Sequence, residues 1–571
     1  MLILSLKANK KSFNEIIFNP TGLSIVSGTK GKSDSTKTFN GVGKSLMIRL
    51  IDFCLGSNPI KNFEELEGWI FYLEVKINEE KYIISRETKN PQKIYINGEE
   101  KKLKDFLSWL EKKIFIDLKK TPFLTTRGLL KRFIRPTKDA YISYNKIDKK
   151  EEDYTSLILD SYLLGLNIEL IQTKYNLVKQ LKATKESIKF IQKLEYVKKY
   201  VDGKKKDNVY LRIKDLESTL LELEKKLKEF KIAENYSEVE TKLKELNAHH
   251  QEIENKIFIL NKRIEALNKN LEFSRSIENS EVYKLYEIAK IEIKDMIKKR
   301  MDEVEEFQRM MLENRNKRYK TELEKLILQK NELETVVIKT QTEINQSIKF
   351  LNSHGALKEY ETLLNEIRSK EQELAKLNEY QELVEKEKEK KDSLDKELIL
   401  EKEKTTKYLN DNKKELDDLN NLFREFSRKL YPDKLSGLDI QNNDGENLTR
   451  FSVKAEIDGD SSDGINSAKI FCYDIVKLFK AKEYIKFLIH DSRLFSEIDP
   501  RQIILSMKEI LKLTEEYNLQ YIFTINENIL ESLKKEDEEF YMELKKKIVK
   551  NLYDTSDSTK LLGIKINLKY E

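Results

Sequence analysis

The sequence predicts an α/β head built from both ends of the chain, with a long antiparallel coiled coil between the two ends. Three observations support this fold class. Strand-like segments and a phosphate-loop pattern occupy the N-terminal part, apolar residues then repeat with heptad spacing, and strand and helix patterns return near the C-terminus. Neither end alone carries all the parts of a nucleotide site, so we expect the two ends to fold together.

The composition favours long helices over disorder. Of the 571 residues, 36% are charged and 39% are hydrophobic, with only 17 glycines and 7 prolines. The net charge is +6, from 106 basic and 100 acidic residues, so the total charge does not indicate nucleic-acid binding. Cys54 and Cys472 stand far apart in apolar segments, which predicts buried thiols and excludes a zinc clasp made of cysteines. No apolar run approaches ~20 residues, so we expect a soluble cytoplasmic protein without membrane contact.

The N-terminal half of the head is predicted over residues 1–165. A helix over residues 45–55 ends at Gly56, a residue type that commonly caps helix C-termini. Alternating and continuous apolar runs predict strands at Leu2–Leu6, Leu23–Ser27, Trp69–Ile77, Lys81–Arg86 and Lys93–Ile96.

Two heptad seams predict the coiled coil. The first runs through residues 216–230 and 243–271, with His250 at a seam position, and the second runs from residue 323 to 351 and continues more loosely towards Leu422. The ascending arm, 166–271, and the descending arm, 322–425, are nearly equal in length, as expected if the second returns antiparallel along the first. The turn-around, a helical apex, is then placed at 272–321.

The heptad pattern breaks at Asn235-Tyr-Ser237 and at His354-Gly355. Both breaks lie at a similar distance from the middle of the predicted apex, so they would meet if the arm bends there, as an elbow. Two unrelated local breaks explain the pattern equally well.

The C-terminal half of the head is predicted over residues 426–571. Helices at Asp463–Leu478 and Arg501–Tyr517 alternate with strands, as in a layered α/β fold. The strands are predicted around Ile440 and at Thr449–Ile457, Ile485–Ile489, Gln520–Ile525 and Leu561–Lys569.

A phosphate-binding loop is predicted at residues 38–45, between a strand and an apolar helix. In such a loop the backbone N–H groups cradle phosphates, Lys44 reaches the β- and γ-phosphates, and the Ser45 hydroxyl binds Mg²⁺. Thr38 replaces the usual first glycine. A second candidate, Gly28-Thr-Lys-Gly-Lys-Ser33, is not followed by a helix and is interpreted as an inserted loop. The predicted ATP-binding residues of the loop are Asn40, Gly41, Val42, Gly43, Lys44 and Ser45.

Phe487-Leu-Ile-His-Asp491 has the pattern of a Walker-B strand, whose final carboxylate would hold Mg²⁺ together with Ser45. One helix later, a second strand ends at Asn526, the place of a switch residue that senses the γ-phosphate. Asp499 between them fits a D-loop that contacts ATP. An ordinary buried strand is the alternative for residues 487–491.

Ser461-Ser-Asp-Gly464 precedes a predicted helix. Such a turn can supply N–H donors to a γ-phosphate across a dimer interface, so Ser462 and Gly464 are candidate ATP contacts of a signature motif. A plain helix N-cap is the alternative.

These segments resemble SMC-like ATPases. The runs NGVGKSLMIRLIDFCLG, SSDGINSAKIFCYDI, FLIHDSRLFSEIDPRQ and YIFTINE are similar to those of the SMC-like subunits of bacterial ABC-three-component systems and of anti-phage systems such as Lamassu. The resemblance covers both halves of the head. It implies an ABC-type head that closes as an ATP-sandwiched homodimer, uses ATP and Mg²⁺, and senses foreign double-stranded DNA with partner subunits.

Two positions depart from that family. Ser492 stands where SMC heads carry the glutamate that activates water, and Asn526 stands where they carry histidine. Neither residue can act as a base at neutral pH. His490 and Glu497 are the candidate replacements, although strand alternation points His490 away from Asp491. We therefore expect slow turnover and a long-lived closed clamp.

A basic stretch follows the predicted N-terminal strands, and no glutamine marks a Q-loop, for which Pro122–Gly128 is the nearest candidate. The basic side chains of this stretch could neutralise DNA phosphates. The alternative is an amphipathic helix whose Leu129, Leu130 and Phe133 pack inward. The candidate DNA contacts are Lys119, Lys120, Arg127, Lys131, Arg132 and Arg135.

The sequence thus predicts an ATP-binding, ATP-hydrolysing DNA sensor or clamp of a bacterial defence complex, with a small accessory subunit and an effector or nuclease as partners. No nuclease pattern rises above chance in the chain itself. Two other functions stay open: a DNA repair or recombination ATPase of SMC type, and a coiled-coil scaffold with an inactive head.

Overall fold

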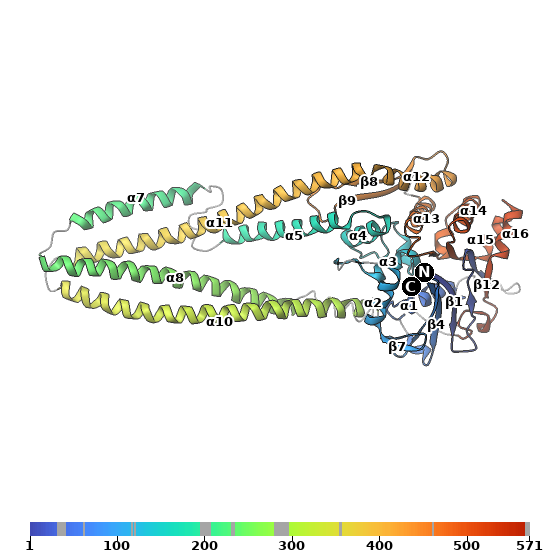
Figure 1. The fold of residues 1–571 in the computed structure, drawn as a ribbon, viewed down its shortest axis with the longest axis horizontal. Helices are drawn as coiled ribbons and strands as arrows, with labels where there is room; N and C mark the ends of the chain where they lie inside the picture. The colour runs from blue at the N-terminus through green and yellow to red at the C-terminus, as the bar shows by residue number, and fades with distance from the viewer. Residues whose placement is uncertain are drawn as a thin grey trace. The chain divides into compact units, whose positions relative to one another are not determined.

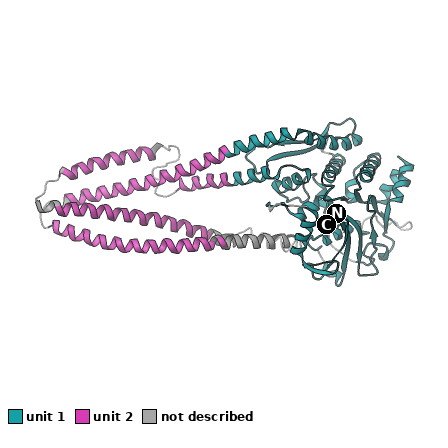
Figure 2. Cartoon of the chain, in the orientation of Figure 1, with its two compact units in different colours: residues 1–179, 293–299, 397–571 teal, residues 180–292, 300–396 magenta. Residues whose placement is uncertain are grey.

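The computed structural model describes residues 1–30, 41–60, 63–115, 118, 121–193, 207–229, 234–278, 296–352, 357–459 and 462–565. It divides into two compact units (Figure 2). The head unit comprises Met1–Lys179, Ile293–Lys299 and Glu397–Glu571, and the arm unit comprises Gln180–Glu292 and Arg300–Lys396. The predicted fold class is confirmed: an α/β head is assembled from the two ends of the chain, and the chain between them forms long antiparallel helices. The domain boundaries given above stay predictions.

A parallel sheet joins the two ends of the chain. Its order is β10 (Phe487–His490), β11 (Gln520–Asn526), β3 (Gly22–Thr29) and β12 (Ile548–Tyr553). β3 comes from the N-terminal half and lies between two strands of the C-terminal half, and all three pairings are parallel. β3 and β11 are buried along almost their whole length, as expected of strands covered on both faces. The carboxyl ends of these strands share one edge, where ligands of open α/β sheets bind.

A second sheet is antiparallel and belongs to the N-terminal half. Its order is β2-β1-β4-β5-β6-β7, with β1 at Leu2–Ala8, β2 at Ile16–Ile17, β4 at Ile70–Ile77, β5 at Glu80–Glu87, β6 at Lys93–Ile96 and β7 at Glu99–Lys102. Residues along β4 alternate between buried and half-buried, as the strand period requires. Helix α1 (Lys44–Cys54) contacts β3, β4 and β5, so it packs against both sheets.

Further helices of the head unit pack around these sheets, for example α2 (Leu103–Ile114) against β6 and β7, and α14 (Pro500–Glu516) against β3 and β11 (Figure 1). Helix α13 (Asp463–Lys480) contacts α3, α4, α12, β9 and β10, which makes it the central helix of the C-terminal half. The helices and the remaining strand pair are α2 (Leu103–Ile114), α3 (Thr126–Ile134), α4 (Asp153–Leu164), α5 (Ile168–Ile191), α12 (Lys413–Leu430), α14 (Pro500–Glu516), α15 (Glu527–Leu533), α16 (Glu538–Lys546), β8 (Ser436–Asn442) and β9 (Phe451–Ile457).

The strand predicted at residues 561–569 is not found in its described part. Residues 561–565 form turns, and the Leu561 N–H donates to the Val42 carbonyl at 3.0 Å instead of to a sheet neighbour. The last strand of the parallel sheet is β12, which the sequence analysis missed. Only Leu552 of β12 is fully buried, because this strand lies at the edge of the sheet, so its apolar pattern is weak.

The arm unit is a bundle rather than a single pair of helices. Its long helices are α7 (Asp207–Glu229), α8 (Glu234–Glu278), α10 (Met296–Asn352) and α11 (Leu357–Asp411), of which the last continues into the head unit. Arg212 of α7 pairs with Glu373 of α11 at 3.0 Å, and the neighbouring Gln372 donates to Glu254 of α8 at 3.0 Å. Since residues 212 and 254 are nearly equidistant from the junction of α7 and α8, these two helices run antiparallel along the same stretch of α11.

The ends of the arm helices pack in one apolar cluster. It contains Leu227 of α7, Leu243 of α8, Leu351 of α10 and Tyr360 of α11, which flank the two junctions in the arm. This packing fits the predicted elbow. Residues 235–237 themselves lie inside α8, whereas His354-Gly355 and residues 279–295 of the predicted apex lie outside the described residues.

The two cysteines are free and buried, as predicted. Burial raises the pKa of the Cys54 thiol to about 12, so this thiol stays protonated and unreactive at neutral pH. Among the helices in the described ranges, none is both long and apolar enough to span a membrane.

Candidate nucleotide site

The loop before α1 has the backbone of a phosphate cradle. Gly41 and Gly43 have φ values of 74° and 106°, in the left-handed region that favours glycine. A Cβ on Gly43 would overlap the Cβ of Leu561, because the C-terminal segment crosses directly over this residue. Asn40 and the rest of residues 31–40 lie outside the described residues. Gly43 is the N-cap of α1, so the first N–H groups of the helix have no partner within the helix and can bind an anion.

Lys44 lies across the end of β3. A Cβ on Gly28 would come within 2.5 Å of the Lys44 Nζ, so any larger residue at position 28 would displace the end of the lysine side chain. Lys44 is 5% exposed, and burial lowers its pKa to about 8, although the negative charge of Asp491 opposes the shift. A desolvated cation at a helix N-terminus is a strong binding group for an anion.

Ser45 and Asp491 meet at the same place. The Ser45 hydroxyl donates to the Asp491 Oδ2 at 2.6 Å, across 446 positions of sequence. Asp491 follows β10 directly, and its other carboxylate oxygen accepts the Arg493 N–H at 3.1 Å. A hydroxyl and a carboxylate are two of the oxygen ligands that Mg²⁺ prefers. No group of three or more His, Cys, Asp or Glu side chains that could hold a metal ion exists in the described ranges.

Asn526 ends β11 beside Gly28, with which it is paired in the sheet. Its Oδ1 is buried and has no hydrogen-bond donor among the described residues. An orphaned buried acceptor is costly in a protein interior unless a bound group satisfies it. Its position next to Lys44 therefore fits a site that holds water or a phosphate in its occupied state.

His490, proposed above as a catalytic residue, faces away from the site. It is fully buried, its Nδ1 lies 2.9 Å from the Tyr521 hydroxyl, and its Nε2 lies 3.0 Å from the Asp474 Oδ2. Burial lowers the pKa of His490, and the hydrogen bond and negative charge of Asp474 partly offset this lowering. These contacts make His490 part of a buried polar network. Successive side chains of a strand point to opposite faces, so His490 and Asp491 face in opposite directions.

Glu497, the other candidate base, is exposed, and its main-chain carbonyl faces Gly464. A Cβ on Gly464 would come within 2.5 Å of that carbonyl oxygen, so the glycine lets the start of α13 approach the loop after Asp491. Ser492, which replaces the usual glutamate, donates its N–H to the Thr524 hydroxyl at 2.8 Å. Its own hydroxyl lies 3.4 Å from Asp491.

Two further predicted ATP contacts, Ser462 and Asp499, lie on the surface of the head unit. Ser462 is exposed and caps α13, and Asp499 is exposed and caps α14 by accepting the Arg501 N–H at 2.9 Å. The structure does not bring these residues to Lys44 within one copy of the chain. Val42 is buried beside Gly43, and Ser461 lies outside the described residues.

The predicted DNA contacts on α3 need correction, since the arginines point inward. Arg127 donates to the Asp52 carboxylate at 2.5 Å and to the Leu55 carbonyl at 3.0 Å, and thus caps the C-terminal end of α1. Arg132 and Arg135 are fully buried. Their charges are used within the protein and cannot meet DNA phosphates. Lys131 is half-buried, and Lys119 and Lys120 lie outside the described residues.

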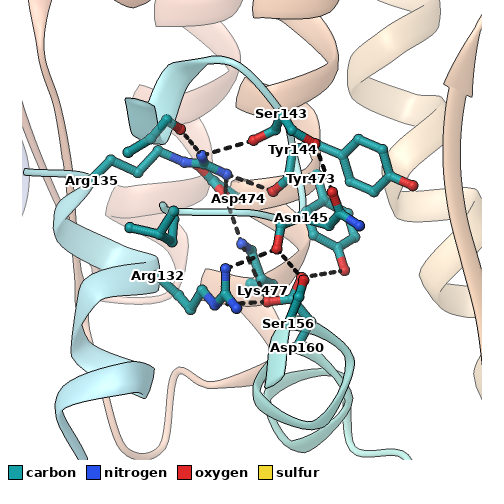
Figure 3. A network of polar contacts seen from close by, with 12 residues as sticks. Arg132, Arg135, Ser143, Tyr144, Asn145, Ser156, Asp160, Tyr473, Asp474 and Lys477 are labelled. Atoms are coloured by element: carbon teal, nitrogen blue, oxygen red, sulfur yellow. Dashed lines mark hydrogen bonds and ion pairs between the residues drawn. The ribbon is translucent and has the colours of Figure 1, made fainter. Parts of the chain in front are cut away.

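Figure 3 shows the polar contacts of Arg132 and Arg135. Arg132 pairs with Asp160 at 3.2 Å, and Arg135 forms an ion pair with Asp474 of α13. Lys477 also pairs with Asp474, at 2.8 Å. Burial alone would raise the pKa of Asp474, but Arg135 and Lys477 outweigh burial and hold it well below its usual range. This network joins α3 and α4 of the N-terminal half to α13 of the C-terminal half.

Tyr141 is a residue of the site that the sequence analysis missed. Its hydroxyl oxygen accepts the Asp491 N–H at 2.7 Å. Tyr141 lies in a short 3₁₀ turn at Lys138–Tyr141, after α3. The contact with the Asp491 main chain thus comes from this turn and not from the Q-loop candidate at 122–128. A tyrosine in an irregular loop carries no spacing pattern, so no signal in a single sequence could have indicated it.

The two ends of the chain form one α/β head with a parallel sheet at its centre, and the chain between them forms long antiparallel helices. Residues 426–566 match the profile of a bacterial family described as "Uncharacterised protein conserved in bacteria (DUF2326)". The chain is also similar to "Uncharacterized protein YydD" of Bacillus subtilis (strain 168), with 25% identity over 407 residues. That match covers 65% of this chain and 64% of the relative, slightly less than two thirds of the relative's length.

Solved structures of SMC heads are similar to the chain over most of its length. A head domain with coiled coil and joint from Pyrococcus yayanosii has 15% identity and a TM-score of 0.35, and the match covers 92% of each chain. A head domain with an extended coiled coil from Pyrococcus furiosus, solved with the C-terminal domain of ScpA, has 13% identity and a TM-score of 0.31, with 93% of this chain and 91% of that chain covered.

Proposed function

We propose that the chain is an SMC-like ATPase subunit that binds ATP and Mg²⁺ at the edge of its parallel sheet. The hydrogen bond between Ser45 and Asp491 is the observation that carries this proposal. These two residues come from opposite ends of the chain, and nothing in local folding requires them to meet. A Mg²⁺ site shared by a phosphate loop and a Walker-B strand explains why they do.

The residues present fit the proposed ligands. Lys44 and the N–H groups at the start of α1 would hold the phosphates, and Ser45 and Asp491 would hold Mg²⁺. Bound Mg²⁺ neutralises charge that develops on the phosphates during transfer. Asn526, with its unsatisfied acceptor, would orient a water molecule but cannot remove its proton. Turnover would therefore be slow.

Two copies are needed for a complete site in this proposal. Ser462 and Gly464 stand at the start of α13, where helix N–H groups have no partner within the helix. These donors would reach the γ-phosphate bound to a second copy, which makes ATP the link between two heads. Glu497, on the exposed loop packed against Gly464, would enter the same interface.

Replacing Lys44 by alanine tests the proposal. Because a buried cation that contacts the phosphates is lost, we expect ATP affinity to fall about 100-fold or more, equivalent to about 3 kcal/mol. Binding of a fluorescent ATP analogue and the dimer fraction with ATP are the measurements. Lys486→Ala, which removes a lysine from the opposite end of β10, is the matched control. If Lys44→Ala changes neither ATP binding nor dimerisation, the chain is a scaffold with an inactive head.

The pH dependence of ATP binding gives a second test. The pKa of Lys44 is lowered to about 8 by burial in the nucleotide-free protein, and bound phosphates would raise it. Binding must then take up a proton above pH 8, so affinity is expected to fall up to about tenfold per pH unit from there. Below pH 8, Lys44 is already protonated, so its titration should cause no change in ATP affinity. Lys44→Arg, whose guanidinium stays charged, should bind more weakly but lose this dependence, and equal wild-type affinities at pH 7 and pH 9.5 would contradict the expectation.

In its finer form, the proposal is a sensor or clamp for double-stranded DNA in an anti-phage complex that gates an effector through a small accessory subunit. The motif resemblance given above supports this form. ATPase rates with linear and with circular DNA, with Lys44→Ala as background, test the DNA step. A repair ATPase is distinguished by its gene neighbours, which would lack a toxic effector.

A further inference from the structure

Two hydrogen bonds fix the main chain just after β10. The Asp491 N–H donates to the Tyr141 hydroxyl at 2.7 Å, and the next N–H, that of Ser492, donates to the Thr524 hydroxyl at 2.8 Å. Thr524 belongs to β11 and so holds Ser492 to its own sheet. Tyr141 comes from a loop outside the sheet, and its ring meets His490 edge-on with centroids 6.4 Å apart.

The loop of Tyr141 is tied to α13 at two points. Arg135 donates to the carbonyls of Ala140, Ser143 and Tyr144 and at the same time pairs with Asp474 of α13. In the first turn of α13, the Asn466 amide donates to the Ile142 carbonyl at 3.1 Å. The position of α13 therefore determines the position of this loop, and with it that of the Tyr141 hydroxyl.

We propose that Tyr141 is a positioning residue that couples helix α13 to the Mg²⁺-binding carboxylate of Asp491. The inference rests on the proposed function, and it adds a regulatory contact to the same site. A second head that binds the start of α13 would act through Asn466 and Arg135 on the loop, and through the Tyr141 hydroxyl on the main chain of Asp491. The neighbouring N–H of Ser492 is held separately, by Thr524 of the sheet, so it serves as an independent reference for the Tyr141 contact.

The Tyr141→Phe variant tests the hydroxyl without removing the ring from its packing. We expect the concentration of Mg²⁺ that half-saturates ATP turnover to rise about tenfold, because contacts that orient a metal ligand typically contribute that much. ATP binding without Mg²⁺ should stay unchanged. Hydrogen exchange of peptides that cover residues 487–495 should become faster in Tyr141→Phe without nucleotide, which is a readout independent of turnover.

Asn466→Ala and a double-mutant cycle test the coupling itself. If α13 acts through the loop, Asn466→Ala raises the half-saturating Mg²⁺ concentration in the wild type but adds nothing in Tyr141→Phe. Thr524→Val, which removes the other anchor, is the control and should be additive with Asn466→Ala. Additive effects of Asn466→Ala and Tyr141→Phe would overturn the coupling.

The failures of the two proposals are distinguishable. If the wild-type protein binds no ATP, the proposed function is wrong, and the inference about Tyr141 is wrong as well. If the wild type binds and hydrolyses ATP, and Tyr141→Phe has the same Mg²⁺ dependence and the same exchange at 487–495, only the inference is wrong.

Discussion

Asp474→Ala is expected to lower the free energy of unfolding of the head unit by about 3–5 kcal/mol, because removing one partner strands buried charges. Asp474 is fully buried and contacts Arg135, Lys477 and His490, all three of which are also fully buried. The urea midpoint of the head transition, followed by tyrosine fluorescence, measures the change. Because the pKa of Asp474 is depressed in the folded state, its contribution is present above the ordinary value of 3.8 and is lost only on further acidification.

Asp153→Asn is the matched control for Asp474→Ala. Asp153 pairs with Lys146 at 2.7 Å, but its side chain is 80% exposed. Solvent screens such a pair, so we expect a loss of less than about 1 kcal/mol. If the two variants unfold at the same urea concentration, the buried network of α3, α4 and α13 does not hold the two halves of the head together.

Gly43→Ala is expected to abolish tight ATP binding. At φ 106° a side chain costs about 1–3 kcal/mol, and the new Cβ would also overlap Leu561, so the loop and the segment over it must move apart. A shift of about 1 Å in a binding loop can cost about 100-fold in function. Binding of a fluorescent ATP analogue and the thermal midpoint measure the two effects.

Gly41→Ala separates the steric effect from the backbone effect. Gly41 also has a positive φ, 74°, but a Cβ there would meet nothing within 4 Å. We expect a loss of about 1 kcal/mol in stability and a smaller loss of ATP affinity than in Gly43→Ala. Equal losses in the two variants would show that contact with Leu561 does not shape the loop.

The parts of the site that could be predicted from sequence are those whose chemistry lies in adjacent residues. Gly43, Lys44 and Ser45 form a local motif, and Asp491 ends an apolar strand, so each has a recognisable pattern. The arginines of α3 were misinterpreted because a charge pattern does not reveal its partner. Arg135 meets Asp474, 339 positions away, and no local signal distinguishes that pair from a DNA contact.

The arm illustrates a similar limit. Heptad spacing predicts which residues of α8 and α10 face a neighbouring helix, and Leu243 and Ile344 are indeed fully buried. Heptads do not predict that α7 and α8 run antiparallel along one stretch of α11. That arrangement includes polar pairs such as Arg212 with Glu373. In the sequence, these charged residues cannot be distinguished from the solvent-exposed charged residues of any coiled coil.

The place of β3 between β11 and β12 has a consequence for synthesis of the protein. β3 is made early, but both of its neighbours emerge only after the whole arm, with the last one ending at Tyr553. At about 5–20 residues per second, its apolar edges would wait on the order of a minute for their partners. During that time the nascent N-terminal half exposes unpaired strand edges of the kind that promote aggregation.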